Sequence, residues 1–279
     1  MIKSRKWAAM LFLPGFAGFA LFWLYPTARS VAISMTNYIG NEFVFLRHYM
    51  SLSHTQAFGL AARNTLVVTG LAVLLTMSCS FIIAYCIDRY AKLRFLTYLM
   101  LLPFILSGVT VGYVWRSFFD LNGYANKMLL LLGLNIADWR NGVLAFVPLM
   151  TLFLWRYTGI GVFVFVAALR SIPQEHVEAY ELESKSTIKR ISKVLLPGIF
   201  PQTVFIFFII LMFSFSITQE TDVLWRMYPP RELYILQNFI SNNFLKLDYE
   251  SAAAASTLFL LVVVIILASV SRLEKRFEP

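Results

Sequence analysis

Arg156 lies within a strongly apolar stretch of the chain, LFLWRYTGIG, where an ionised side chain is unusual. A charged residue at the centre of a bilayer costs about 2.5–3.5 kcal/mol on insertion scales, so Arg156 must face protein or water. Its neighbours Trp155 and Tyr157 add aromatic faces, which together with a few polar groups suit a sugar. Two interpretations stay open: Arg156 is a donor that lines a solute path, or it is a structural partner for an acid or a carbonyl group on a neighbouring helix.

Three serines in other apolar stretches are weaker candidates for the lining of a cavity. They are Ser214, Ser216 and Ser256. Serine hydroxyls in a helix also bond to carbonyl groups of their own helix, and this alternative stays open for each of them. The run Ala252–Ala255 favours close packing, because small side chains let two helices approach each other.

The segment from Ser171 to Gly198, SIPQEHVEAYELESKSTIKRISKVLLPG, is highly charged although apolar stretches flank it. Ser171 and Gln174 have the spacing of a capping box, which predicts a short acidic helix. A second, basic helix is predicted from about Thr187, where apolar residues recur at helical spacing. One interpretation is an ordinary solvated loop. The other is a docking element whose apolar side chains enter a groove of a cytoplasmic partner.

Motifs of self-contained catalysis are absent from the sequence. It contains no GxxxxGK[ST] nucleotide-binding loop, no HExxH, no paired Cys-x-x-Cys and no Gly-x-Ser-x-Gly. Both cysteines, Cys79 and Cys86, lie in one apolar run, so neither a disulfide framework nor a metal site is indicated. The net charge of +9 is spread between the apolar runs, which argues against nucleic-acid binding. We therefore expect no catalytic residue, metal or cofactor in this chain.

Membrane-spanning helices are needed to position these candidates. Of the 279 residues, 59% are hydrophobic and 14% are charged, whereas a soluble domain carries about 25% charged residues. The composition predicts an all-α polytopic membrane protein with a single transmembrane domain, residues 1–279. A spanning helix needs about 20 apolar residues. The six predicted spans are approximately 7–28, 65–87, 95–118, 143–169, 195–217 and 251–271.

The basic residues predict the orientation of these spans, because Lys and Arg are enriched in cytoplasmic segments. If the N-terminus is cytoplasmic, the inner segments hold 14 of the 24 Lys and Arg residues. These segments are shorter in total than the outer ones, which lie near 29–64, 119–142 and 218–250. Both termini and the charged segment from Ser171 to Gly198 are then cytoplasmic.

The charged segment resembles a signature of the permease subunits of ATP-binding-cassette importers. In that family the loop carries Glu-Ala-Ala, three residues, Gly, nine residues, Ile, one residue and Leu-Pro. This chain has the same spacing, with Tyr180 in place of Ala, Ser184 in place of Gly and Val194 in place of Ile. The family's glycine permits a turn between two short helices. The residues that the resemblance assigns to ATPase coupling are Glu178, Ala179, Tyr180, Ser184, Leu196 and Pro197.

Further landmarks resemble the sugar-type importer permeases over nearly the whole chain. The triplet Asn64-Thr65-Leu66 matches the entry to the second span, and the start WLYPTARSVAISMTNY is similar to the first permease of maltose- and glycerol-phosphate-type transporters. A family pattern of Pro, Trp and Gly-x-x-Asn is matched by Pro103, Trp115, Gly123 and Asn126. After the fifth span the family's Thr-x-Gly-Gly-Pro is replaced by residues 218–222, so a different outer gate is expected.

The resemblance implies a permease subunit for a sugar or oligosaccharide in a bacterial cell membrane. It also implies its partners: a second, homologous permease, two cytoplasmic subunits that bind and hydrolyse ATP, and an extracytoplasmic solute-binding protein. The alternative is a secondary transporter or channel without ATPases, which predicts ionisable residues in several spans, whereas only Arg156 and Arg116 qualify. A membrane-embedded enzyme comes third, because paired His, Asp or Glu residues at membrane depth are missing.

Overall fold

The computed structural model of the chain describes residues 12–37, 42–173, 175, 177, 178, 180, 186–226 and 228–277. Within these residues the secondary structure is almost entirely helical, apart from an isolated antiparallel bridge between Thr36 and Phe43. In the described part of the chain five helices are long and apolar enough to span a membrane, and a bent pair of helices makes a sixth candidate span. The predicted class, an all-α polytopic membrane protein, is thereby confirmed.

The candidate spans follow the predicted apolar stretches, with shifted ends. They are Phe12–Ser34, which ends in α2 (Tyr25–Ser34); α4 (Gln56–Arg89); the bent pair Arg94–Ile105 and Gly108–Phe118; Gly142–Ser171, most of which is α9 (Phe146–Ser171); Phe200–Trp225, made of α13 (Phe200–Phe215) and α14 (Thr218–Trp225); and Tyr249–Arg272 within α16 (Tyr249–Phe277). The shorter helices α3 (Arg47–His54), α8 (Tyr124–Leu131) and α15 (Leu236–Leu245) lie between these spans in the sequence.

The chain forms two compact units, and the first of them comprises residues 1–62 and 236–265. Within this unit the hydroxyls of Ser34 and Tyr49 share a hydrogen bond of 2.6 Å, which joins α2 to α3. The four alanines of Ala252–Ala255 are all buried, as expected of small residues in close helix packing.

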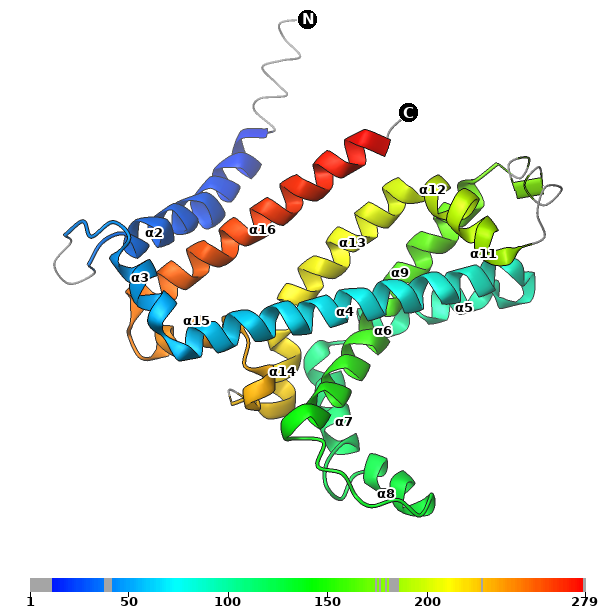
Figure 1. Ribbon diagram of the computed structural model, residues 1–279, viewed down its shortest axis with the longest axis horizontal. Helices are drawn as coiled ribbons and strands as arrows, with labels where there is room; N and C mark the ends of the chain where they lie inside the picture. Colours follow the sequence, from blue (N-terminus) through cyan, green and yellow to red (C-terminus); the bar gives the residue numbers. More distant parts are fainter. Residues whose placement is uncertain are drawn as a thin grey trace, which may run out of the picture. The chain divides into compact units, whose positions relative to one another are not determined.

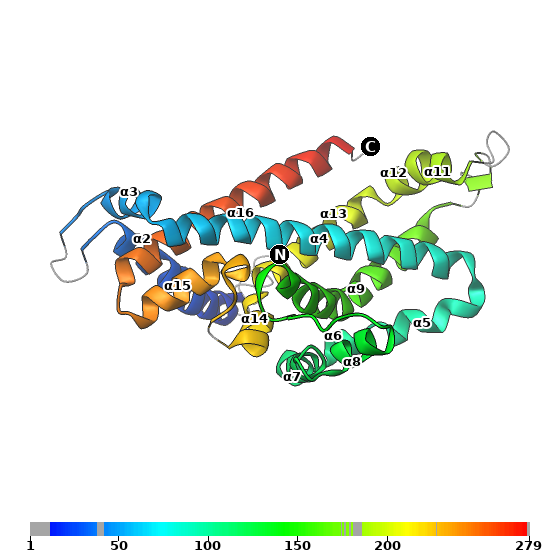
Figure 2. The ribbon, with the colours of Figure 1, turned by 60° about the horizontal axis from the view of Figure 1, so that its bottom comes forward.

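The second unit, residues 63–235 and 266–279, holds the main apolar core around α9. This helix is apolar on all sides, which is typical of a buried helix, and its buried side chains include Leu149, Phe153 and Phe165. Helices α13 and α14 contact α9, and so do the three short helices within residues 94–118 (Figures 1 and 2). The side chains of α9 are therefore positioned by several neighbouring helices at once.

The third predicted span, 95–118, is wrong as a single straight helix. It consists of α5 (Arg94–Leu99), α6 (Leu102–Ile105) and α7 (Gly108–Phe118), and its two arms meet at 93°. Leu106 and Ser107 are extended at the break, with ψ of 146° and 123°. Glycine has a low helix propensity, and a Cβ at Gly108 would lie 2.8 Å from Arg156 Cζ. The break thus brings a glycine backbone against the arginine side chain, inside protein, where irregular backbone at membrane depth is tolerated.

The fifth predicted span, 195–217, and the outer segment expected at 218–250 also need correction. The span begins only at Phe200, with Pro201 in the first turn of α13, because residue 199 leaves the helical conformation. At its other end the chain continues through a turn into α14, which packs against α7 (Figure 1). Glu220 and Thr221 of α14 are buried, so the beginning of the expected outer segment belongs to the core.

Two asparagines among the sequence landmarks hold loops to the helices. The Asn64 amide donates to the carbonyl oxygens of Arg231 and Tyr234 over 2.7 and 3.0 Å, which ties α4 to the segment after α14. Asn126 donates to two carbonyl groups, including that of Ala137, and accepts from the Ala137 amide and the Trp139 indole. A buried polar side chain needs such partners, which explains why asparagine suits both positions.

Gly159 lies at a point of close packing in the second unit. A Cβ there would collide with the backbone carbonyl of Met100, which is part of a turn and cannot move as a side chain can. We expect Gly159→Ala to lower the midpoint of thermal unfolding of the detergent-purified transporter, since overpacking costs about 1–3 kcal/mol. Gly70→Ala is the control, because a Cβ at Gly70 meets nothing within 4 Å. Equal midpoints for both variants would contradict this packing.

Candidate functional site

Arg156 of α9 is paired with Glu220 of α14 within the second unit. Its Nη1 donates a hydrogen bond to Glu220 Oε1 over 2.8 Å, and the Tyr157 hydroxyl donates to the same oxygen over 3.0 Å. Glu220 is 2% exposed, and the Arg156 side chain is 14% exposed. Of the two interpretations of Arg156, the partner acid on a neighbouring helix is therefore present. A role in a solute path stays a prediction.

Aromatic rings surround this charge pair. Tyr157 stacks on Phe213 of α13, with ring centroids 4.6 Å apart, and meets Phe104 of α6 edge-on at 6.2 Å. The Arg156 guanidinium lies 5.2 Å from the centroid of the Tyr157 ring, within the range of a cation–π contact. The charged groups are thus held in an environment of low polarity, where an electrostatic interaction is stronger than in water.

Two buried atoms of the pair have no hydrogen-bond partner among the described residues. They are Arg156 Nε, a donor, and Glu220 Oε2, an acceptor. Buried polar groups are nearly always paired in native proteins, so such atoms call for an explanation. One explanation is a hydroxyl-bearing molecule that donates to the one atom and accepts from the other.

Trp155 points to a different part of the unit from Arg156 and Tyr157. Its ring lies 5.0 Å from that of Trp115 of α7, and it is 40% exposed. The Trp115 indole in turn donates to Thr151 Oγ1 over 3.2 Å. Arg156 and Tyr157 share the Glu220 carboxylate, whereas Trp155 contacts Trp115, so the predicted trio divides between the charge pair and a separate tryptophan contact.

The three candidate serines bond to their own helices. The hydroxyls of Ser214, Ser216 and Ser256 donate to the carbonyl groups of the residues three or four positions earlier, over 2.7, 3.4 and 2.8 Å. This is the second of the alternatives that the sequence left open. Among the hydrogen bonds of the described residues, none links Ser214 or Ser216 to Arg156. A cavity-lining role for these serines stays a prediction without support from their geometry.

Glu220 is the site residue that sequence reasoning missed. The sequence places Glu220 in the outer segment 218–250, because its polar neighbours end the apolar stretch. The available signal was Arg156 itself, since a cation at membrane depth requires an acid nearby. The partner is 64 residues away in the sequence, and only the packing of α14 against α9 selects it from the other acids.

The charged segment after α9 contains helices on both sides of its undescribed part. Glu175, Val177, Glu178 and Tyr180 are helical, and α11 (Thr187–Arg190) begins where the second helix is predicted. Ser186 caps α11 by accepting from the amide of the residue three positions later, over 3.5 Å. The candidate residues Ala179 and Ser184 lie outside the described residues.

The predicted capping box at the start of this segment is wrong for Ser171. This residue is the last of α9, and its hydroxyl donates to the Ala168 carbonyl over 2.7 Å, inside the helix. The helix continues further than the polar residues suggest, because the apolar neighbours Leu169 and Ile172 are buried in the core. Burial of apolar side chains thus outweighs the local preference of serine for a cap.

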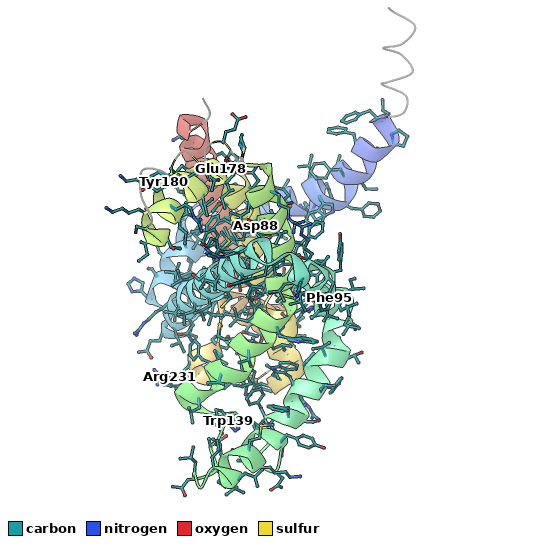
Figure 3. All side chains as sticks on the ribbon, turned by 90° about the vertical axis from the view of Figure 1, so that its right-hand side faces the viewer. Asp88, Phe95, Trp139, Glu178, Tyr180 and Arg231 are labelled. Carbon is teal, nitrogen blue, oxygen red and sulfur yellow. The ribbon has the colours of Figure 1, made fainter. Side chains whose placement is uncertain are left out.

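The segment is anchored by apolar residues and exposes others. Val177 and Ile191 pack against the core, whereas Glu178 is exposed and Ile188 is 80% exposed. Figure 3 shows Glu178 and Tyr180 at the same end of the unit as Asp88, with Trp139 at the opposite end. The remaining candidates, Leu196 and Pro197, are exposed in the first turn of α12 (Leu196–Gly198). An exposed acid and an exposed isoleucine on an anchored segment are suited to contact another protein.

Residues 89–279 match the sequence pattern of the family described as binding-protein-dependent transport system inner membrane component. The chain belongs to this family. Permeases of this kind are the membrane subunits of binding-protein-dependent importers, so the function expected from the sequence is confirmed at this level. The alternative of a transporter or channel that works without ATPases is set aside.

Relatives of this permease cover most of its length. The arabinooligosaccharides transport system permease protein AraP of Bacillus subtilis (strain 168) is 29% identical over 238 residues, which are 82% of this chain and 76% of AraP. The sn-glycerol-3-phosphate transport system permease protein UgpA of Yersinia enterocolitica is 26% identical over 212 residues, 74% of this chain and 72% of UgpA.

Solved structures share the fold of this permease. One chain of a bacterial ABC transporter involved in the import of the acidic polysaccharide alginate superposes with a TM-score of 0.85 at 20% identity, over 100% of this chain and 98% of that one. A chain of the bacterial alginate ABC transporter in complex with an alginate pentasaccharide-bound periplasmic protein gives 0.82 at 22% identity, over 98% and 96%. This chain therefore shares its fold with a chain of that alginate transporter.

The charge pair predicts how substitutions at Arg156 and Glu220 combine. Glu220→Leu leaves the arginine buried without its acid, and loss of one partner of a buried pair destabilises by about 3–5 kcal/mol. We expect each single leucine variant to lower the thermal unfolding midpoint of the purified transporter. The double variant Arg156→Leu, Glu220→Leu should recover most of this loss, because no unpaired charge remains. Additive losses in the double variant would show that the two residues do not interact.

Proposed function

We propose that this permease imports a sugar or oligosaccharide into a bacterial cell. The support comes from two sides: the relatives are named for arabinooligosaccharides and for sn-glycerol 3-phosphate, and a structure of the same fold belongs to an alginate importer. The aromatic surroundings of Arg156 and Glu220 suit the alternating hydroxyl groups and apolar faces of such a solute.

Four partners complete the proposed transporter. They are a second, homologous permease, two cytoplasmic subunits that bind and hydrolyse ATP, and an extracytoplasmic solute-binding protein. ATP is thus used by partner subunits, and this chain holds no cofactor. A complex of an alginate transporter with its periplasmic protein supports the last of these partners by analogy.

The solute path is proposed to pass the charge pair. Arg156 Nε and Glu220 Oε2 offer one donor and one acceptor, which two neighbouring hydroxyl groups of a sugar could engage. The break at Leu106 and Ser107 lies next to Arg156, because Gly108 contacts its guanidinium. Broken helices within a membrane occur where backbone lines a cavity or lies in protein. The pair therefore lies where two arms of a bent helix and α14 converge on α9.

Coupling to the ATPases is assigned to Glu178. The single observation that carries this proposal is the exposure of Glu178 on a segment whose Val177 packs against the core around α9. A partner that moves Glu178 must therefore also move the helix beside it and, through Val177, the end of the spans. ATP binding would close the ATPases, and this motion would turn the permease from inward- to outward-facing.

The orientation proposed for the permease places both termini and Glu178 in the cytoplasm. Four arginines line one cavity together with Asp88 and Glu178, and an excess of basic residues at one end of the spans is typical of a cytoplasmic face. The first span precedes this unit, and its basic residues at 3, 5 and 6 lie before the apolar stretch.

Charge reversal at Glu178 tests the proposed coupling. We expect Glu178→Lys to insert into the membrane and to assemble, but to lose the ATPase stimulation caused by solute-loaded binding protein. Loss of one partner of a buried charged contact costs about 2–5 kcal/mol, enough to weaken docking at least tenfold. The measurement is ATPase activity of the reconstituted transporter, with a solute chosen beforehand by uptake across a panel of sugars.

Glu175→Lys is the matched control, because Glu175 is exposed on the same short helix. It makes the same change of charge and should keep the stimulation. Normal stimulation in Glu178→Lys, or equal loss in both variants, would refute the assignment of coupling to Glu178.

Sided labelling tests the proposed orientation. Single cysteines at Asn37 and at Thr187, in a background without Cys79 and Cys86, should react with a membrane-impermeant maleimide from opposite sides of the membrane. Thr187→Cys is expected to react only after the membrane is opened, and Asn37→Cys in intact spheroplasts. Labelling of Asn37→Cys only from the cytoplasmic side would overturn the orientation.

A further inference from the structure

A cavity of about 530 Å³ is lined by Asp88, Glu178 and their neighbours. Figure 3 shows these two residues at one end of the second unit. Arginines from four separate segments line the cavity: Arg89 ends α4, Arg94 begins α5, Arg170 lies in the last turn of α9 and Arg190 ends α11. Arg89 and Arg94 precede Arg170 and Arg190 by at least 76 residues in the sequence, so only the fold brings the four side chains to one cavity.

Basic side chains outnumber acidic ones among the described residues that line the cavity. Four of these residues are arginines and two, Asp88 and Glu178, are acids, so this described part of the lining carries two more positive than negative charges. Arg170 Nε lies 3.6 Å from Asp88 Oδ1, which is an ion pair within the lining itself. A guanidinium group keeps its charge in proteins and presents several N–H donors, so each of the four arginines is suited to bind an anion.

Tyr85 orders two of these arginines. Its hydroxyl oxygen accepts hydrogen bonds from Arg89 Nη1, over 3.4 Å, and from Arg190 Nη2, and the Arg190 guanidinium lies 5.8 Å from the ring centroid. Two guanidinium groups are therefore held on one tyrosine before any ligand arrives. Because this oxygen accepts from both, the phenolic proton of Tyr85 remains for donation to an anion.

The cavity also has an apolar side, and it is too large for a small bare ion. Volumes of 300–1,000 Å³ are about those of pockets for organic ligands. Apolar side chains line part of it, namely those of Leu169, Ile172, Val177 and Leu195. A ligand with a doubly charged head and an organic portion fits this division of the lining.

Membrane topology alone does not explain this arrangement. The preference of Lys and Arg for the cytoplasmic side requires only that they lie near the ends of the spans. It does not require four arginines to converge on one cavity, nor a tyrosine that orders two of them. Planar guanidinium groups match the oxygen geometry of phosphate, and a phosphomonoester carries about two negative charges at pH 7.

We propose that this cavity binds a phosphate-bearing anion. The source is either the headgroup of an anionic lipid, such as the doubly charged cardiolipin, or a soluble phosphorylated metabolite, and the recognising chemistry is the same. Because Val177 and Glu178 line the cavity as well, the bound anion joins the coupling segment to the ends of α4, α5 and α9. This regulatory consequence rests on the proposed function, whereas the binding itself does not.

The test uses the purified transporter in nanodiscs and measures thermal unfolding of the permease without ATP. A ligand that binds only the folded state raises the unfolding midpoint. One arm compares discs of phosphatidylcholine with discs that also contain cardiolipin. The other arm keeps phosphatidylcholine and adds glucose 6-phosphate or inorganic phosphate. A midpoint raised by cardiolipin identifies a lipid source, and one raised by a soluble phosphate identifies a metabolite.

Two double variants distinguish binding in the cavity from nonspecific attraction of anions to nearby basic residues. Arg89→Gln with Arg94→Gln removes two of the four guanidinium groups of the described lining, and should weaken the response to the active probe at least tenfold in concentration. Lys92→Gln with Lys193→Gln is the matched control, because both lysines are exposed and neither lines the cavity. It should respond as the wild type does.

Two results would overturn the proposal: no probe shifts the midpoint of the wild-type transporter, or the arginine and lysine variants respond alike. Both are independent of ATPase coupling, since no nucleotide is present. A failure of the Glu178 assignment therefore leaves this measurement interpretable, and a failure here leaves the import function untouched.

Discussion

The buried ion pair between Arg156 and Glu220 constrains the arrangement of the second unit. A single charge at this depth in a membrane is costly, so the two residues must stay together whenever both are away from water. Since Arg156 is on α9 and Glu220 is on α14, the pair requires the chain after α13 to turn back into the protein and pack there. The bend before α7 follows from the same requirement, because Gly108 makes room for the guanidinium.

Small residues supply the rest of the close packing around the pair. A Cβ at Gly112 would lie 2.9 Å from Val223 Cβ, so α7 and α14 approach each other only because residue 112 is glycine. Gly161 plays the same part between α9 and α4, where Ser80 also donates to the Thr158 carbonyl over 3.0 Å. Lipid tails are as apolar as leucine, so helices in a membrane gain association chiefly from such close contacts and hydrogen bonds.

At the end of the second unit that carries Glu178, apolar contacts rather than a buried ion pair hold the structure together. There Val177 and Ile191 anchor the charged segment by apolar contacts, while Glu178 and Ile188 remain exposed. The arginines that predict the topology in the sequence also line one cavity, so the same charges would serve both membrane insertion and the anion binding that we propose. An apolar anchor and a polar, exposed edge are what a segment needs in order to pass motion from a soluble subunit to the spans.

The sequence by itself determined the class, the approximate spans, the family and the helix at Thr187, because apolar run length, charge distribution and motif spacing are local properties. It also identified Arg156 as a residue that requires a partner. Only the tertiary structure decided that this partner is Glu220, that the chain breaks at Leu106 and Ser107, and that α9 continues through Ser171. Each of these depends on contacts between residues far apart in the chain, where the pairing of charges and the burial of apolar side chains outweigh local preference.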